Sequence, residues 1–181
     1  MVKRRIHALL PVLLFCAANS IPVAGGKAAL AVKAAYLVRF AAYVVWPPEQ
    51  LGSEAPLMLC VIGNDPFGPL LDEAAIGQSV DGRPIRLVRA AAITPRSRCH
   101  IAYIAGSAVQ RKDSALALLR GTPVLTVTDS AQDEAHGVID FQIVRQRVGF
   151  RVDRAAAEDG GLSISARLLE LALSVRQGSG K

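Results

Sequence analysis

The sequence contains few of the residue types that build catalytic and metal-binding sites. It has three histidines and three cysteines among 181 residues, and none follows a Cys-x-x-Cys or His-Glu-x-x-His spacing. His100 adjoins Cys99, and His136 falls in a polar stretch. We interpret His100 as a structural or exposed histidine, and we expect no metal site.

Motifs for nucleotide binding and hydrolysis are also missing. The chain has no Gly-x-Ser-x-Gly sequence, and residues 63–68 contain neither a Walker lysine nor a Gly-x-Gly-x-x-Gly spacing. Asp65, Asp72 and Glu73 are close in sequence, but the first turns of helices favour acidic residues through the helix dipole alone. These absences predict a binding or regulatory protein that is not an enzyme and uses no cofactor.

A long apolar run occurs only at the N-terminus. Lys3, Arg4 and Arg5 precede the apolar stretch 8–18, which is the pattern of a secretory signal peptide. A retained membrane anchor would need a longer apolar span, and Phe15 argues against lipid attachment at Cys16. We therefore predict that residues 1–24 are a cleaved signal peptide and that the mature protein is periplasmic.

Loss of this segment changes the charge of the chain. It removes three basic residues and no acidic ones, so the formal charge falls from +6 to +3. The basic character of the whole chain therefore overstates any affinity for polyanions, and we expect no nucleic-acid partner. The roughly 155 residues that remain suit one domain. We predict a single α/β domain over residues 28–176, followed by a frayed polar tail at 177–181.

Two cysteines, Cys60 and Cys99, remain after the signal peptide. An even pair in an exported protein suggests one disulfide. Two buried free thiols are the alternative.

The stretch from Leu57 to Ile62 is continuously apolar and predicts a strand buried on both faces, as in a parallel sheet. Gly63 allows a sharp turn, Asn64 or Asp65 can cap a helix, and Pro66 suits its first turn. In open α/β sheets, ligands bind at the carboxyl ends of such strands. The ligand-pocket candidates are therefore Gly63, Asn64, Asp65, Phe67 and Gly68.

Helical and strand patterns alternate along the rest of the chain. Helices are expected at 28–46, 67–76, 107–120 and 154–159, and in a last segment after Ser163 or Ser165 that includes Val175. Strands are expected at 83–88, 101–105 and 123–128, with a hairpin formed by 138–144 and 148–152. We predict a three-layer α/β fold with a mostly parallel sheet flanked by helices and an antiparallel hairpin at one edge. If the strand at 101–105 lies beside the first strand, Cys99 comes close to Cys60.

Three aromatic residues fall on one face of the first predicted helix. They are Tyr36, Phe40 and Tyr43, with Trp46 at the helix end, whereas Lys33 and Arg39 fall off this stripe. We expect the stripe to pack against the sheet; the alternative is that part of it forms an exposed partner surface. The partner-binding candidates are Tyr36, Phe40, Tyr43, Trp46 and, on the last helix, Leu168.

A basic cluster offers a second interaction surface. Arg145, Arg147, Arg151 and Arg154 form the densest group of basic residues. Most such clusters are solvated. The alternative is contact with an acidic partner or a cell-wall polymer.

Three stretches together resemble the YfiR/HmsC-type family of small periplasmic proteins. They are Val32–Leu37 with Phe40 and Trp46-Pro47, then Cys60–Gly68, and finally Phe150–Asp153 running into Gly161–Ser165 and Leu168-Leu169. Each motif alone is weak, but their order and spacing are fairly specific, and they span nearly all of the mature chain.

The resemblance implies an α/β periplasmic protein that often dimerises and represses an inner-membrane diguanylate cyclase with an exported sensory region. Relief of repression by an outer-membrane lipoprotein or by a redox change would then raise cyclic-di-GMP and promote biofilm formation. The competing hypothesis is a periplasmic small-molecule sensor with its pocket at residues 63–68.

The resemblance also bears on the cysteines. Cys60 and Cys99 match positions at which family members carry a disulfide, but this chain lacks the second cysteine pair of some members. It therefore implies one structural bridge rather than a redox switch. The chain also has Asp153 where the family usually has Asn.

Overall fold

The computed structural model describes residues 24–52, 55–129 and 135–178. Residues 1–23 of the predicted signal peptide and residues 179–181 of the predicted tail lie outside the described part of the chain.

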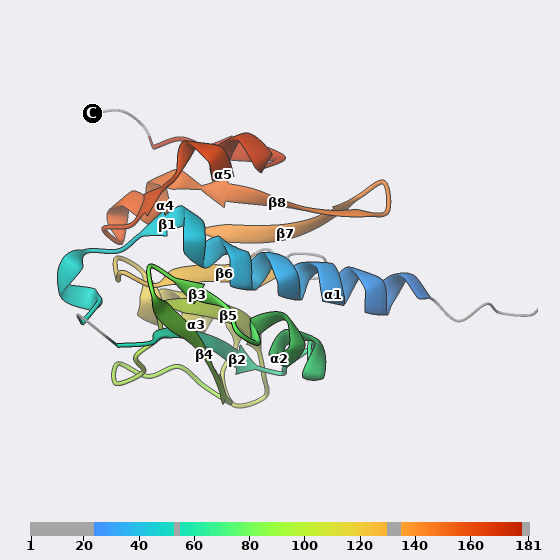
Figure 1. Ribbon diagram of the computed structural model, residues 1–181, viewed down its shortest axis with the longest axis horizontal. Coiled ribbons are helices and arrows are strands. Elements are labelled where there is room, and N and C mark those ends of the chain that lie inside the picture. The colour runs from blue at the N-terminus through green and yellow to red at the C-terminus, as the bar shows by residue number, and fades with distance from the viewer. Residues whose placement is uncertain (1–23, 53–54, 130–134, 179–181) are drawn as a thin grey trace, which may run out of the picture.

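A mixed, mostly parallel sheet forms the middle layer of the fold (Figure 1). In the described residues it has eight strands in the order β10-β8-β7-β6-β5-β2-β4-β3. The strands β2, β4, β5, β6 and β7 run parallel to one another, β3 and β8 run antiparallel to their neighbours β4 and β7, and β10 is parallel to β8. Their bounds are β2 Leu57–Gly63, β3 Ser79–Val80, β4 Arg83–Ala90, β5 Ile101–Gly106, β6 Leu125–Asp129, β7 Ile139–Val144, β8 Arg147–Asp153 and β10 Ser174–Arg176.

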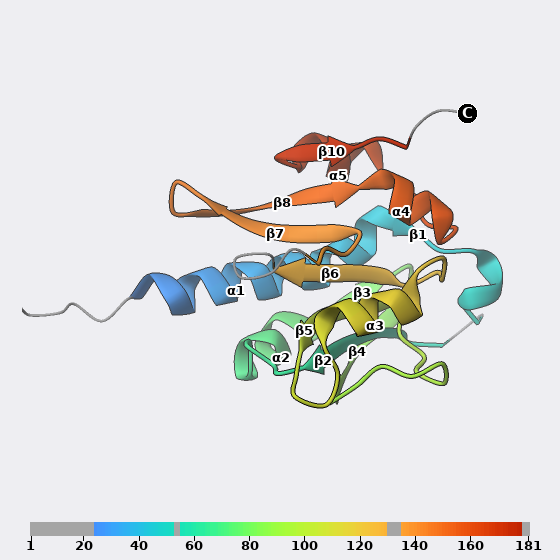
Figure 2. The ribbon, with the colours of Figure 1, turned by 180° about the vertical axis from the view of Figure 1, so that it is seen from behind.

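Helices lie on both faces of this sheet, which confirms the predicted three-layer α/β fold. Helix α1 crosses one face in Figure 1, and α3 covers the opposite face in Figure 2. A short two-stranded sheet pairs β1 with β9 beside α5. The remaining bounds are α1 Ala24–Arg39, η1 Phe40–Tyr43, β1 Val44–Val45, η2 Pro48–Gln50, α2 Pro69–Ala75, α3 Lys112–Leu119, α4 Arg154–Asp159, β9 Ser163–Ile164 and α5 Ala166–Leu171.

The central strand β2 is buried between β4 and β5, as its apolar sequence predicts. At its end, Gly63 has φ +93°, and a Cβ atom there would lie 2.3 Å from the carbonyl oxygen of Gly106. Only glycine allows β2 and β5 to approach this closely at their carboxyl ends. The structure thus meets the condition stated for the cysteines, because β5, predicted at 101–105, lies beside β2.

The disulfide follows from this order. Cys60 on β2 is bonded to Cys99, just before β5, with the two Cα atoms 5.8 Å apart. Both cysteines are buried in a smaller apolar cluster on the α3 side of the sheet, together with Ile62, Ile104 and Ala115. The structure therefore has one bridge, and the alternative of two free thiols is wrong.

The boundaries of several elements differ from the prediction. The first helix ends at Arg39 and tightens into η1, because Val44 and Val45 extend to pair with β9. The last helix ends at Leu171, and residues 174–176 form β10 instead. The hairpin is therefore not at the edge of the sheet, because β10 pairs with β8 outside it. Helices α2 and α3 begin at Pro69 and Lys112, later than expected, and Gly68 rather than Asn64 or Asp65 is the N-cap of α2.

Candidate functional site

The predicted ligand pocket lies at the carboxyl edge of the sheet, and most of its residues have structural roles. The Phe67 ring is buried and packs edge-on against Tyr103 with centroids 4.8 Å apart. Asp65 accepts a hydrogen bond from the Phe67 amide at 2.7 Å and closes the turn. Asn64 lines a cavity of about 410 Å³ together with Gly106 and Lys112. A ligand at residues 63–68 stays a prediction.

Arg89 on β4 ties this turn to α2. Its guanidinium donates to both carboxylate oxygens of Asp72, at 2.8 and 3.1 Å, and its Nε donates to Asp65 at 2.7 Å. The hydrogen bonds from Arg89 lower the pKa of Asp72. Asp65 and Asp72 therefore act here as anchors of the turn, each paired with the same arginine.

Three of the five partner-binding candidates are in the core. Phe40 and Trp46 are 1% and 4% exposed, and Leu168 is 2% exposed. Phe40 packs against Phe141 and Phe150 with ring centroids 5.8 and 5.2 Å apart. These three side chains belong to the main apolar cluster and present no exposed surface, and partner binding through them stays a prediction. Tyr36 and Tyr43 are half-buried and keep part of their surface accessible to solvent.

Lys33 has an unexpected position. It lies off the aromatic stripe but is buried, with its ammonium paired with Asp129 at the end of β6 and 5.9 Å from the centre of the Phe141 ring. The signal for this burial is that Ala34, Leu37 and Val38 make more than one side of α1 apolar. A helix buried over so wide an arc also encloses a lysine on that arc.

The end of the β7–β8 hairpin projects from the carboxyl edge of the sheet, the edge at which α1 also begins (Figures 1 and 2). Ile143 and Val144 are 53% and 47% exposed there, on opposite faces of β7. The turn at Arg145 and Gln146 has positive φ at both residues, as a two-residue hairpin turn requires. We call residues 143–148 the hairpin end.

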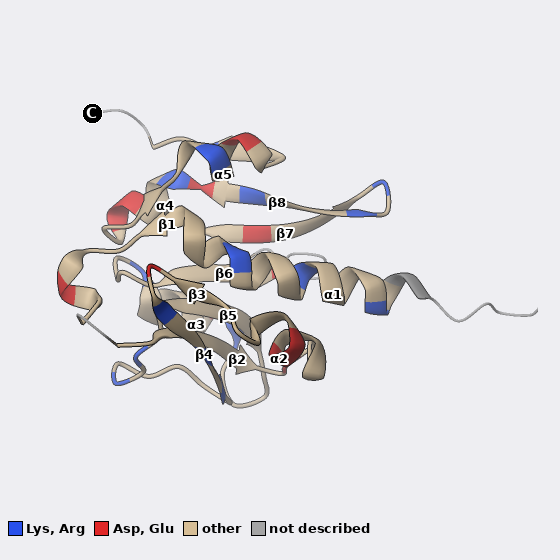
Figure 3. Ribbon diagram, in the orientation of Figure 1, with Lys and Arg blue, Asp and Glu red and all other residues tan. Residues whose placement is uncertain are grey.

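The predicted basic cluster is divided between two roles. Arg151 donates to the buried Asp140 at 2.9 Å, and Arg154 pairs with Glu158 at 2.7 Å. Arg145 and Arg147 are exposed and form no ion pair with any described residue. Figure 3 shows these two charges at the tip of the hairpin end, which therefore combines apolar side chains with free cations.

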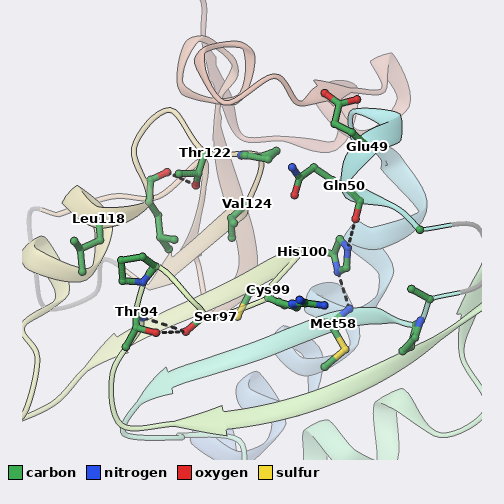
Figure 4. A pocket seen from close by; sticks show the side chains of 17 residues that line it. Glu49, Gln50, Met58, Thr94, Ser97, Cys99, His100, Leu118, Thr122 and Val124 are labelled. Carbon is green, nitrogen blue, oxygen red and sulfur yellow. Dashed lines mark hydrogen bonds between the residues drawn. The ribbon is translucent and has the colours of Figure 1, made fainter.

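A larger cavity lies at the amino edge of the sheet, on the side away from the hairpin end. Its volume is about 660 Å³, and its walls come from the segment before β2 and from the starts of β2, β5 and β6 (Figure 4).

His100 joins the segment before β2 to the start of β2 in the cavity wall. Its Nδ1 accepts a hydrogen bond from the Met58 amide at 2.9 Å, its Nε2 lies 3.2 Å from the Gln50 carbonyl, and its own carbonyl accepts from Trp46 Nε1 at 3.2 Å. Since Nδ1 is the acceptor, Nε2 carries the proton and donates to Gln50. His100 is thus structural, as predicted.

Comparison with known families identifies the chain. A model of the YfiR/HmsC-like family matches residues 30–173, which include the disulfide, the cavity and the hairpin end. The chain belongs to the YfiR/HmsC-like family. No curated protein matches it.

As a YfiR/HmsC-like protein, the chain belongs to a regulatory, non-catalytic group of periplasmic proteins that act in cyclic-di-GMP signalling. In residues 24–52, 55–129 and 135–178, no helix combines the length and apolar character needed to cross a bilayer. The same residues contain no group of three or more His, Cys, Asp or Glu side chains arranged to hold a metal ion.

Proposed function

We propose that the mature protein binds the exported region of an inner-membrane diguanylate cyclase and represses it, and so lowers cyclic-di-GMP and biofilm formation. Membership of the YfiR/HmsC-like family carries this proposal. The hairpin end supports it, because it presents exposed apolar side chains and unpaired arginines on a projecting element.

The hairpin end is the proposed contact surface. Protein interfaces have an apolar centre and are enriched in arginine. The hairpin end has this composition, because it contains Ile143, Val144, Arg145 and Arg147. The complementary surface on the cyclase is an apolar patch with acidic residues beside it.

Helix α1 extends this surface on one face of the hairpin. Tyr36 packs edge-on against Phe150 with ring centroids 5.6 Å apart, and the exposed Val32 precedes Tyr36 by one helical turn. Ile143 follows Phe141 on the same face of β7. Tyr36 therefore remains a partner-binding candidate, whereas the buried Phe40 acts from below by supporting the rings around it.

Binding of the exported cyclase region to purified protein tests this proposal. Replacement of both Ile143 and Val144 by Asp places two charges in the contact and should weaken binding by at least about 30-fold, the effect of losing a central contact. Val109→Asp is the control, because Val109 is also apolar and is 74% exposed in the loop between β5 and α3, outside the hairpin end. It should leave binding unchanged.

The cellular counterpart is the cyclic-di-GMP level. The double variant should raise it, and Val109→Asp should not. Normal binding by the double variant, or an equal loss in both variants, would refute the hairpin end as the contact surface. Absence of binding by the wild-type protein would refute the repressor proposal itself.

A further inference from the structure

The cavity at the amino edge of the sheet has the size of a small-molecule site. Its volume of about 660 Å³ falls within the range of ligand pockets in proteins, roughly 300–1,000 Å³. It lies at the opposite end of the strands from residues 63–68, where the sequence predicts a ligand. It lies at the edge of the sheet opposite the hairpin end, so ligand binding here can be tested separately from the proposed repressor role.

The floor of the cavity is apolar. Met58 on β2 and Val124 before β6 contribute side chains to it, and Cys99 contributes one half of the disulfide (Figure 4). Leu118 and Leu119 at the end of α3 form another wall. A ligand that fills this space needs an apolar body to displace water favourably.

The unpaired polar groups in the cavity are mainly hydrogen-bond donors. Arg98 makes no hydrogen bond or ion pair with any described residue, although it lines the cavity. The side-chain amide of Gln50 is also unpaired among the described residues and points toward Thr122 and Val124 in Figure 4. The carboxylate of Glu49 points away from Cys99 and His100 in the same view.

The other polar side chains of the cavity are already engaged. Thr94 and Ser97 hydrogen-bond to each other at 3.2 Å, and the Thr122 hydroxyl donates to the Leu119 carbonyl at 2.6 Å. Both imidazole nitrogens of His100 are occupied by backbone groups. Among the described lining residues, the Arg98 guanidinium and the Gln50 amide therefore supply the free hydrogen-bond donors, while the Glu49 carboxylate lies apart from the disulfide wall.

We propose that this cavity binds a small organic carboxylate with an apolar body. The planar guanidinium of Arg98 matches the two oxygens of a carboxylate, and the Gln50 amide supplies a further donor. A phosphate ester fits less well, because the described lining residues include no second Lys or Arg for its second charge. The apolar body of the ligand lies against Met58, Val124 and the disulfide.

Trp46 provides a direct readout of binding. It is the single tryptophan of the chain, it is buried, and its ring centroid lies 6.2 Å from that of His100 in an edge-on contact. A ligand against the cavity wall changes the environment of His100 and hence the fluorescence of Trp46. The signal reports on this cavity, since no second tryptophan contributes.

The experiment titrates octanoate and phenylpropionate into the mature, disulfide-bonded protein after it has been denatured and refolded to remove ligand carried through purification. Binding is followed by Trp46 fluorescence and by isothermal titration calorimetry. Each acid is compared with its neutral amide, and the two acids distinguish an aliphatic from an aromatic ligand body. We expect at least one acid to bind, and its amide to bind at least about tenfold more weakly, because the charge-assisted hydrogen bonds to Arg98 are lost.

Variants test the site directly. Arg98→Met should weaken acid binding by at least about tenfold, whereas Arg96→Met, at an exposed arginine outside the cavity, should not. Leu118→Glu places a negative charge in the wall at an exposed position and should also weaken it. The proposal is overturned if neither acid binds up to about 5 mM, if amide and acid bind equally, or if Arg98→Met binds like wild type.

Discussion

Reduction of the Cys60–Cys99 disulfide should lower the stability of the fold by a predictable amount. The bridge closes a loop with a sequence separation of 39 residues. The chain-entropy relation assigns a loop of this length about 4 kcal/mol of stabilisation at room temperature. Because β2 and β5 remain paired beside the bridge, reduction should leave the fold intact and shift the melting temperature down by roughly 10 °C.

The assay is urea unfolding of the mature protein with and without a reductant. A variant with Cys60→Ala and Cys99→Ala is the control. With or without reductant, its free energy of unfolding should equal that of the wild-type protein with the disulfide reduced. A difference below about 1 kcal/mol between oxidised and reduced wild type would refute the loop-entropy argument. Two reactive thiols in the denatured, unreduced protein would refute the bridge itself.

Three further predictions concern the fold around the proposed sites. Lys33→Met leaves Asp129 partly buried without its cation and should cost about 3 kcal/mol in urea unfolding, and a second change, Asp129→Asn, should recover most of this loss. Burial raises the pKa of the Tyr103 phenol, so the folded state keeps this proton when the unfolded chain has lost it. The contribution of this group to the free energy of unfolding should therefore be fully present below about pH 10 and be lost by about 1.4 kcal/mol per pH unit above it. Tyr103→Phe should remove this contribution to the pH dependence, as measured by urea unfolding at several pH values. Gly63→Ala should cost about 3 kcal/mol or more because its Cβ would collide with the Gly106 carbonyl, whereas Gly121→Ala, at φ +69° in open space, should cost about 1 kcal/mol; thermal unfolding of both variants checks this difference.

The central strand β2 could be predicted from sequence because its assignment depends on local signals. The apolar run Leu57–Ile62 is shorter than a buried helix would be and is followed by Gly63, so its strand assignment needs no tertiary information. The sequence left open whether the strand at 101–105 lies beside this one; the structure has the order β4-β2-β5, which brings Cys99 to Cys60.

Elements that depend on distant partners could not be predicted in this way. Residues 174–176 are helical in pattern but pair with residues 151–153 of β8, and Val44 and Val45 extend because Ile164 and Ser163 lie opposite them. Such pairings override the local preference for a helix. The burial of Lys33 and its ion pair could not be predicted for a similar reason, since the carboxylate partner is 96 residues away in the sequence.

The position of the cavity was not predictable from the strand pattern alone. The rule that ligands bind at the carboxyl ends of parallel strands directs attention to residues 63–68. In this chain, however, Phe67 packs into the core there and Arg89 occupies the carboxylates of Asp65 and Asp72. The cavity forms instead at the amino edge, where His100 holds the segment between Trp46 and Met58 through hydrogen bonds that no sequence motif announces.

The main apolar cluster extends from the cavity wall to the base of the hairpin. His100 contacts Trp46, which belongs to the same buried cluster as Phe40, and Phe40 packs on Phe141 and Phe150. Spatial continuity alone is not coupling, because both sites must bias the same two arrangements of the core. Linkage supplies the criterion: if a carboxylate in the cavity changes the affinity of the hairpin end for its partner by some factor, the partner must change carboxylate affinity by the same factor. If each ligand changes the affinity for the other by the same factor, and that factor differs from one, the aromatic core is the element that transmits the signal. If neither affinity changes, the two sites are independent.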